Sequence, residues 1–245
     1  MKKLSALFVF ALFLASQVCA QKLIKTDRDH DGLKGHVQKV TTETARLSKV
    51  DGKEAESARE LSEVTIYDAA GDRTRRESYY KGRLSETNVY SYLDGERVVR
   101  TEFFGNQGST AAPSASGDTR YSIKVKYKYD PQGHRIEATR FRNDGTQASR
   151  SVMIYDAKGN KIEERSYRAN GSQVRKFTYT YDAHGNVAEE SYDFEGDQFD
   201  FRYSYTYELD AQGNWTKSIT SKWVTKEGKS FFEPSLVSYR VITYF

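Results

Sequence analysis

Alternation of apolar and polar residues is the clearest pattern in this chain, and it predicts β-strands. From residue 121 to 129, Tyr, Ile, Val, Tyr and Tyr occupy every second position, and one Ser and three Lys stand between them. The segments 177–181 and 201–207 alternate in the same way, with Phe and Tyr at every second position. Successive side chains of a strand point to opposite faces. Each of these strands is therefore expected to have one aromatic face and one polar face.

The strands recur with a period of about 26 residues. Between strands the chain repeats a Tyr-Asp pair, or Tyr-Glu in the last copy, and most copies have a glycine three residues after the acid. The copies begin at Tyr67, Tyr129, Tyr155, Tyr181 and Tyr207, and Tyr92 begins a degenerate copy, Tyr-Leu-Asp-Gly, from which the segment 105–118 lengthens the next step to 37 residues. A second glycine keeps the same spacing at Gly145, Gly171 and Gly196. Two markers in phase indicate a true internal repeat, and such a repeat predicts one supersecondary unit used many times.

The recurring polar residues are expected to shape turns. An Asp side chain can accept hydrogen bonds from backbone N–H groups just after it, and Gly adopts the left-handed backbone conformation that other residues avoid. The dipeptide Asn170-Gly171 is typical of a tight hairpin turn. The predicted structural turn residues are Asp130, Gly133, Asp156, Gly159, Asp182 and Gly185. Each repeat is therefore interpreted as turn, strand, turn and strand.

The pattern predicts an all-β fold, an antiparallel β-meander of repeated hairpins with about twelve strands. Sheets of that size twist, and we expect a curved strip that closes as far as a half-barrel. A single domain is expected over 36–245, with its first strand at 36–47 and a mobile loop at 105–118, where the residues are small and polar. The strand that follows each Tyr-Asp turn alternates less regularly. In the one after Tyr155-Asp156, Ile162 and Tyr167 are five positions apart, so their side chains face opposite sides of the sheet unless a bulge intervenes.

The first twenty residues read as a secretory signal peptide, with two Lys before an apolar run that is too short to span a membrane. Cleavage near Ala20 would leave a polar leader at 21–35. A lipid anchor at Cys19, the one cysteine, is the less favoured alternative because Val18 is larger than the residue usual before such a cysteine. The protein is therefore expected outside the cytoplasm, either secreted or periplasmic.

The charge pattern excludes some partners and reactions. The formal net charge is +4, and both signs are mixed along the chain, so no basic stripe indicates nucleic acid binding. The neighbouring carboxylates Glu163 and Glu164, like Glu189 and Glu190, are expected on opposite faces of a strand and cannot act together. No nucleophile with its base is evident. We expect a protein that is not an enzyme.

Two groups of residues are candidates for binding. Asp27, Asp29 and Asp31 alternate in the sequence DRDHDG as at the start of a calcium loop, but Gln38 stands where that loop needs a bidentate Glu. We favour a plain leader, with no cofactor, and keep calcium as the alternative. Aromatic side chains that can contact a glycan or peptide form the second group. They are Tyr79, Tyr80, Phe103, Phe104, Trp215 and Trp223, and packing against the sheet is the alternative role for each.

The repeated Tyr-Asp-x-x-Gly-Asn motif with a downstream glycine resembles the YD-repeat, or RHS-repeat, family. The resemblance covers about Tyr67 to Trp215. In large members of that family the repeats form a long β-strip that spirals into a shell around a C-terminal toxin, and a carbohydrate-binding role has been proposed. This chain has about five or six repeats and about thirty residues after Trp215, so neither shell nor toxin is expected.

Three functions follow as hypotheses. The first is a binding or scaffold module of the bacterial envelope that contacts a glycan or a protein through one sheet face. The second is a structural protein whose sheet edge pairs with another chain, for which the last strand, 237–244, is the candidate. The third is a hydrolase whose site is built from loops. The sequence does not determine the ligand or the oligomeric state.

Overall fold

The computed structural model describes residues 25–50, 53–93, 96–104, 119–194 and 201–245. The expected signal peptide at 1–20, its cleavage site near Ala20, Cys19 and the expected loop at 105–118 lie outside the described residues. One short helix, α1 (Asp27–His30), precedes a series of fifteen described strands. No helix in the described part of the chain is long and apolar enough to cross a membrane.

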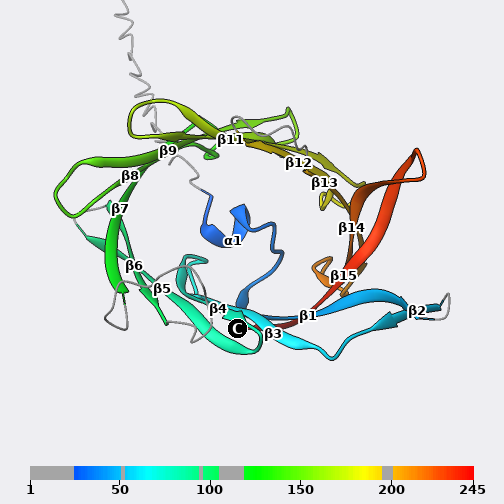
Figure 1. Cartoon of the computed structure of the whole chain (residues 1–245). Helices are drawn as coiled ribbons and strands as arrows, with labels where there is room; N and C mark the ends of the chain where they lie inside the picture. Colours follow the sequence, from blue (N-terminus) through cyan, green and yellow to red (C-terminus); the bar gives the residue numbers. More distant parts are fainter. Residues whose placement is uncertain (1–24, 51–52, 94–95, 105–118, 195–200) are drawn as a thin grey trace, which may run out of the picture.

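The strands follow one another along the chain as an antiparallel meander (Figure 1). Their bounds are β1 Val37–Val50, β2 Lys53–Glu56, β3 Glu60–Tyr67, β4 Arg73–Tyr80, β5 Arg83–Leu93, β6 Glu96–Phe103, β7 Thr119–Tyr129, β8 Arg135–Phe141, β9 Gln147–Tyr155, β10 Lys161–Arg168, β11 Gln173–Tyr181, β12 Val187–Phe194, β13 Phe201–Leu209, β14 Trp215–Lys226 and β15 Lys229–Tyr244. The all-β hairpin architecture is as the alternation predicts.

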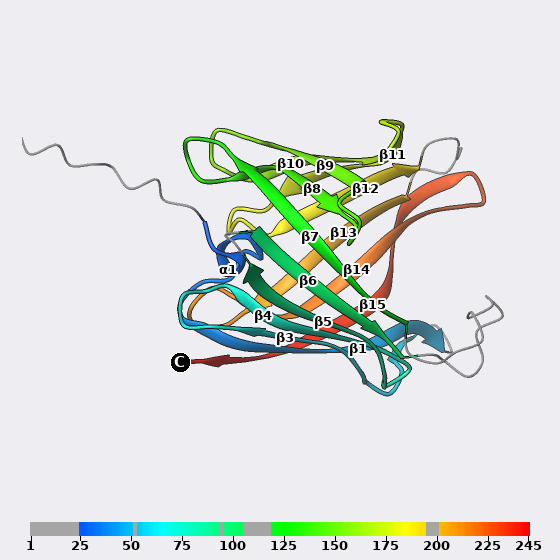
Figure 2. The same cartoon turned by 90° about the vertical axis from the view of Figure 1, so that its left-hand side faces the viewer.

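The sheet closes on itself, and the prediction of an open strip or half-barrel is wrong. Strand β1 pairs with the last strand, β15, from Val37 opposite Tyr244 to Arg46 opposite Leu236. Strand β2 pairs only with the end of β1, so fourteen of the fifteen strands form the wall of a closed barrel (Figures 1 and 2). Closure satisfies the backbone groups of both terminal strands, which an open strip would leave exposed.

In the Tyr-Asp turns that the structure describes, the turn is stabilised by the side chain of its own Asp. Asp156 Oδ1 accepts hydrogen bonds from the backbone N–H groups of Lys158 and Asn160, both at 2.9 Å. Gly159 has a φ of +85° and donates its N–H to the carbonyl of Asp156 at 3.0 Å. The same bonds recur around Asp182. The repeated residues of these turns are therefore set by backbone conformation.

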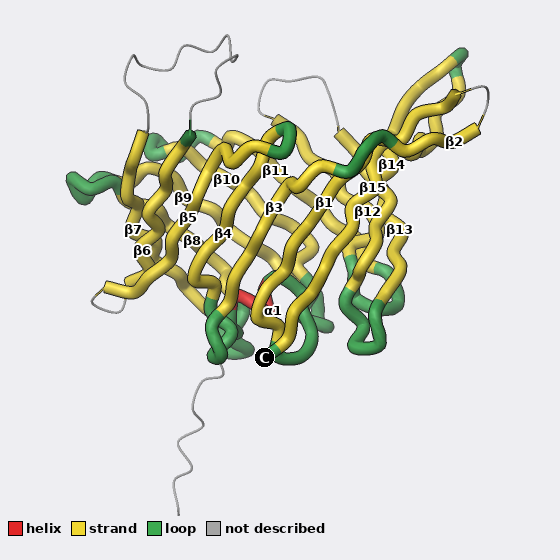
Figure 3. The backbone as a smooth tube through the Cα atoms, turned by 90° about the horizontal axis from the view of Figure 1, so that it is seen from below, coloured by secondary structure: helices red, strands yellow, loops and turns green. Residues whose placement is uncertain are grey.

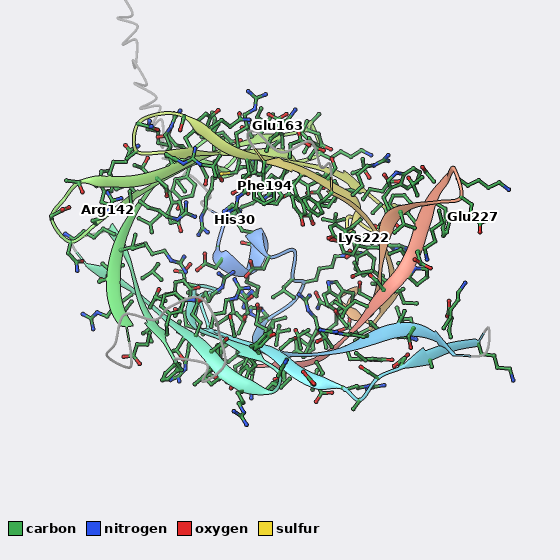
Figure 4. All side chains as sticks on the ribbon, viewed as in Figure 1. His30, Arg142, Glu163, Phe194, Lys222 and Glu227 are labelled. Carbon is green, nitrogen blue, oxygen red and sulfur yellow. The ribbon has the colours of Figure 1, made fainter. Side chains whose placement is uncertain are left out.

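A β-bulge follows the turn in five of the six repeats, all except the one that begins at Tyr92, and sets which side chains face inward. Between β9 and β10, Lys161 lies opposite Tyr155 and Glu163 lies opposite Ile154, so Ile162 is the extra residue. Beyond this bulge the alternation starts afresh. Glu164 points into the barrel, whereas Glu163 points outward (Figure 4). Neighbouring carboxylates on this strand therefore lie on opposite faces.

The barrel is wide enough to enclose the N-terminal segment, which we define as residues Lys25–Gly35. Barrels of about eight strands are filled by their own side chains, whereas larger ones enclose a cavity or channel. Here α1 lies inside the ring of strands, at the same end as the C-terminus (Figures 1 and 3). Leu33 packs there in a small apolar cluster with Val37, Val40 and Tyr67.

Candidate functional site

Inside the barrel, the N-terminal segment is anchored by a buried carboxylate, Asp27, which is 2% exposed. Asp27 forms ion pairs with Arg97 of β6 and Arg135 of β8, the latter at 2.7 Å, and accepts the backbone N–H of Arg73 at 2.9 Å. Burial by itself would raise the pKa of Asp27, but the two arginines outweigh it and hold that pKa below its usual range. The carboxylate therefore stays charged and ties the segment to the wall.

The other two aspartates of the DRDHDG sequence are also engaged by protein groups. Asp31 accepts a hydrogen bond from Tyr67 at 2.6 Å and pairs with Arg73. Asp29 accepts from the backbone N–H and hydroxyl of Thr26, both at 2.8 Å, which caps α1. No cluster of three or more potential metal-ligating side chains occurs among the described residues. The carboxylates proposed for calcium thus point to separate partners.

The N-terminal segment docks on the Tyr-Asp turns of the barrel rim. The N–H of Arg28 donates to the carbonyl of Gly71 at 2.9 Å. The N–H of Lys34 donates to Asn214 Oδ1 at 2.7 Å, and Asn214 Nδ2 donates to the carbonyl of Lys34 at 2.9 Å. Gly71 leaves little room, because a Cβ there would lie 2.8 Å from Thr26 Oγ1. Turn residues such as Gly71 and Asn214 therefore also bind the N-terminal segment.

His30 projects from α1 into the lumen (Figure 4). Its Nε2 is buried and has no hydrogen-bond partner in the described structure. Burial and, after it, the charge of Arg135 lower the pKa of His30 to about 4, although Asp27 and Asp31 oppose the shift. The imidazole is therefore neutral at pH 7, and its protonation would place a second positive charge next to Arg135.

A cavity of about 530 Å³ separates the N-terminal segment from the wall formed by β7 to β15. Cationic side chains outnumber carboxylates on its lining, with six against three. The cations are Lys25, Arg73, Arg135, Arg140, Lys161 and Arg240, and the carboxylates are Asp29, Asp31 and Glu164. Lys161 pairs with Glu164 at 2.6 Å, and Arg140 donates to Ser151 at 3.2 Å. The cavity therefore favours a polar, negatively charged occupant.

Arg240 of β15 stands out among these cations. Its guanidinium carbon lies 3.5 Å from the ring centroid of Trp215, a stacked cation–π contact. Trp215 in turn is 6.0 Å from Tyr207 between ring centroids. All three side chains line the cavity.

The inner face of β11, β12 and β13 is a continuous wall of aromatic rings. Tyr192 lies at its centre, with ring centroids 5.5 Å from Phe177, 4.9 Å from Phe201 and 6.0 Å from Tyr203. Phe194 completes the group and points into the lumen (Figure 4). All five side chains are half-buried, so each keeps an accessible surface inside the barrel. We call these five residues the inner aromatic wall.

Polar groups flank the inner aromatic wall. Lys222 Nζ lies 5.8 Å from the ring centroid of Phe201, and the Arg175 guanidinium lies 5.3 Å from that of Phe194. Toward α1, Tyr205 donates to Glu190 at 3.0 Å. Burial raises the pKa of Tyr205, and Glu190 raises it further, so this hydroxyl remains a donor. Aromatic faces next to such polar groups suit a sugar ring with its hydroxyls.

The outer face has the opposite character and carries ion pairs that connect neighbouring strands. Glu137 of β8 pairs with Lys128 of β7 at 2.7 Å and with Arg150 of β9 at 3.2 Å. Arg202 and Glu189 continue the pattern between β13 and β12. In strand β7, for example, the Lys positions of the alternation face outward and Tyr127 faces the lumen.

The structure does not gather the six aromatic candidates into one site. Trp215 lies in the lumen beneath Arg240, whereas Trp223 lies outside between Phe232, at 4.9 Å, and Arg202, at 4.8 Å. The other four lie at the opposite end of the barrel from α1. Tyr79 donates to Glu77, Tyr80 is 55% exposed, Phe103 is 36% exposed, and Phe104 is half-buried beside Ser85.

Sequence reasoning missed both Arg240 and the inner aromatic wall as site residues. The alternation did predict an aromatic face on these strands. On an open strip, however, that face would not enclose a cavity. Arg240 belongs to the last strand, where the Tyr-Asp repeat has ended. Its position opposite Thr42 of β1 depends on barrel closure.

Comparison with known proteins identifies no family. No family model and no curated protein matches the chain. Among solved structures, a porin-like protein from Bacteroides uniformis overlaps 84% of this chain and 98% of its own, with 14% identity and a TM-score of 0.47. A porin-like protein from Bacteroides vulgatus overlaps 86% and 99%, with 12% identity and a TM-score of 0.39. The TcdB2-TccC3-Cdc42 complex overlaps 80% of this chain and 12% of its own, with 16% identity and a TM-score of 0.30. These overlaps are too loose to assign family or function.

Proposed function

We propose that this protein is a binding module of the bacterial envelope, related to YD-repeat proteins, and that it holds a glycan inside its barrel. The sheet face that contacts the ligand is then the inner one. The proposal includes no chemical turnover and no cofactor. The resemblance of the Tyr-Asp repeats supports the family, and the signal-like N-terminus supports a location outside the cytoplasm.

The observation that carries this proposal is the half-buried state of the inner aromatic wall. Rings that served only as core would be buried by neighbours, since protein interiors are close-packed. Here Tyr192, Phe194 and Phe201 keep accessible surface on the lumen side of the sheet. The 530 Å³ cavity near α1 is lined by other rings, among them Tyr155, Tyr179 and Tyr207, and a cavity lined by aromatic groups and a few polar ones is the usual form of a small-molecule site.

Pairing through a sheet edge, the alternative function, is not favoured. Residues 237–244 of the last strand are already paired with β1 along their whole length. In the described sheet, residues 229–235 of β15 pair with β14 alone and include Pro234, and β2 is a free edge of four residues. Such a short edge offers few backbone groups to a partner chain.

We further propose that the outer wall of the barrel faces water. Spanning barrels present a continuous apolar band to lipid, and a charged residue there is destabilising. On this barrel, Lys128, Glu137, Arg150 and Glu163 face outward on four neighbouring strands. A protein that is monodisperse without detergent supports this, and one recovered only with membranes and detergent contradicts it.

A glycan array with matched variants tests the proposed function. The combined variant Tyr192→Ala and Phe201→Ala removes two rings of the inner aromatic wall, and Trp223→Ala removes a ring of similar exposure from the outer face. Signals on the array should disappear for the inner variant and persist for the outer one, with circular dichroism confirming that both fold. Loss of the signals with Trp223→Ala alone, or no signal for the unmodified protein, would refute a glycan site in the lumen.

A further inference from the structure

Arg240 lies on the inner face of β15, in the wall of the 530 Å³ cavity. Thr42 of β1 is its neighbour across the closing strand pair. One face of its guanidinium is stacked on Trp215 at 3.5 Å. Its Nε is shielded from solvent and makes no hydrogen bond within the described structure.

No carboxylate in the described structure forms an ion pair with Arg240. The carboxylates whose charges act most strongly on Arg240 are those of Glu63 and Asp31. Glu63 already accepts from Arg76 Nε at 2.8 Å, and Asp31 already accepts from Arg73 Nη2 at 2.6 Å. Arg240 thus has no carboxylate partner of its own in the described structure.

Three other lumen arginines next to the N-terminal segment do have carboxylate partners. Arg97 and Arg135 both pair with Asp27, and Arg73 pairs with Asp31. A charge buried without a partner is unfavourable, and proteins normally neutralise it. Burial lowers the pKa of Arg240 to about 10, and Glu63 opposes that shift only in part. Arg240 is half-buried and lines the cavity, so an anion there would neutralise its guanidinium.

The geometry indicates which anion fits. A guanidinium held flat against an indole still offers its edge, and that edge matches the two oxygens of a carboxylate. Tyr207 lies beside Trp215, at 6.0 Å between ring centroids, and supplies a ring face next to the cation. The edge of one guanidinium pairs with one carboxylate. The pocket therefore suits a sugar ring that bears one carboxylate.

We propose that Arg240 is an anion-binding residue and that the glycan held in the lumen is acidic, with a uronic acid carboxylate paired to this guanidinium. This inference rests on the proposed function for the glycan part, whereas the anion site is a property of the cavity itself. Trp215 orients Arg240 for this contact as a positioning residue.

Isothermal calorimetry on the full-length secreted protein tests the proposal, with oligoglucuronate, neutral oligoglucose and sodium sulfate as probes. Arg240→Gln removes the lumen cation. Arg202→Gln is the matched control, because Arg202 also lies over a tryptophan, Trp223 at 4.8 Å, but on the outer face. Oligoglucuronate should bind the unmodified protein and Arg202→Gln equally, and at least tenfold more weakly to Arg240→Gln. Oligoglucose and sulfate should bind more weakly than oligoglucuronate to the unmodified protein.

The outcomes separate the two proposals. Equal affinity of Arg240→Gln and the unmodified protein for oligoglucuronate overturns the anion site and leaves glycan binding intact. Tighter binding of sulfate than of oligoglucuronate overturns the carboxylate assignment. If neither oligosaccharide binds, the glycan proposal fails, and sodium glucuronate alone then decides the anion site. It should raise the melting temperature of the unmodified protein and leave that of Arg240→Gln unchanged.

A fold defect in the variant would be recognised without any ligand. Because Arg240 has no ion-pair partner, the account predicts that Arg240→Gln melts at the same temperature as the unmodified protein or higher. A lower melting temperature without ligand would show that Arg240 stabilises the barrel through a protein partner, and would overturn the proposal.

Discussion

Asp27 Oδ1 lies 2.7 Å from Arg135 Nη1, and this ion pair joins the N-terminal segment to strand β8 inside the barrel. Both side chains are well buried there, and Arg97 completes the arrangement from β6. A segment that precedes the repeats thereby becomes part of the lumen. It narrows one end of the barrel and supplies one side of the cavity.

Replacement of this carboxylate should destabilise the protein strongly. Asp27→Asn leaves Arg97 and Arg135 buried without a counter-charge, and breaking a buried pair in this way costs about 3–5 kcal/mol. Urea denaturation measures the change. Glu189→Gln, which removes an ion pair at 3.3 Å on the outer face, is the control and should cost less than about 1 kcal/mol. Similar losses for the two variants would contradict a structural role of the N-terminal segment.

Substitution of one glycine, Gly71, tests the contact between the N-terminal segment and the turn on which it docks. Gly71 and Gly185 occupy the same place in their turns, with φ of +98° and +85°. Alanine at either position strains the backbone by about 1 kcal/mol. At Gly71 its Cβ would also meet Thr26 Oγ1 at 2.8 Å, whereas at Gly185 nothing lies within 4 Å. Gly71→Ala should therefore be the more destabilising, and proteolysis within residues 25–35 should be faster only in that variant.

Acid should loosen the N-terminal segment through His30. Burial and Arg135 lower the pKa of His30 from 6.5 to about 4, with Asp27 and Asp31 opposing them. The unfolded chain thus takes up a proton at higher pH than the folded one. The stabilising contribution of the neutral imidazole is complete above pH 6.5 and is lost as the pH falls from 6.5 to 4.

The pH dependence has a direct measurement. The free energy of unfolding from urea titrations should fall by about 1–3 kcal/mol between pH 7 and pH 4.5. Part of this fall should be absent in His30→Gln, which cannot take up a proton. His184→Gln, in an exposed turn, is the control and should follow the unmodified protein. An unchanged slope in His30→Gln would rule out His30 as the titrating group.

The turns and strands were predictable from the sequence because the interactions that form each turn lie within a single repeat. The carboxylate of Asp156 and the φ of Gly159 act within one turn, so the motif alone indicates the hairpin. The alternation likewise separated Glu163 from Glu164. The spacing of Ile162 and Tyr167 had left a bulge open as an alternative, and only the register of the strand pair shows that it occurs, at Ile162.

Closure and the cavity were not predictable, because both depend on contacts between distant residues with no shared motif. Val37 and Tyr244 are opposite in the sheet but more than 200 positions apart. Asp27 looked like part of a calcium loop because its arginine partners lie 70 and 108 positions further on. Local spacing carries no information about such pairings, whose formation depends on the curvature of the whole sheet.

A designed disulfide tests the closure. Thr41 and Val241 are opposite in the β1–β15 pair, and Val241 is 70% exposed on the outer face. In a Cys19→Ser background, Thr41→Cys with Val241→Cys should form an intramolecular disulfide under mild oxidation and stabilise the barrel by about 5 kcal/mol. Thr41→Cys with Lys124→Cys, on a distant strand, should not cross-link within one chain. Only intermolecular products from the first pair would favour an open strip.

The central claim is that ligand binds inside the barrel, and single-tryptophan fluorescence tests it most directly. Trp223→Phe leaves only Trp215 in the lumen, and Trp215→Phe leaves only Trp223 on the outer face. Titration with the oligosaccharide selected on the array should shift the emission of the first variant with a saturable curve and leave that of the second unchanged. A saturable shift of Trp223 with no change of Trp215 would contradict the account.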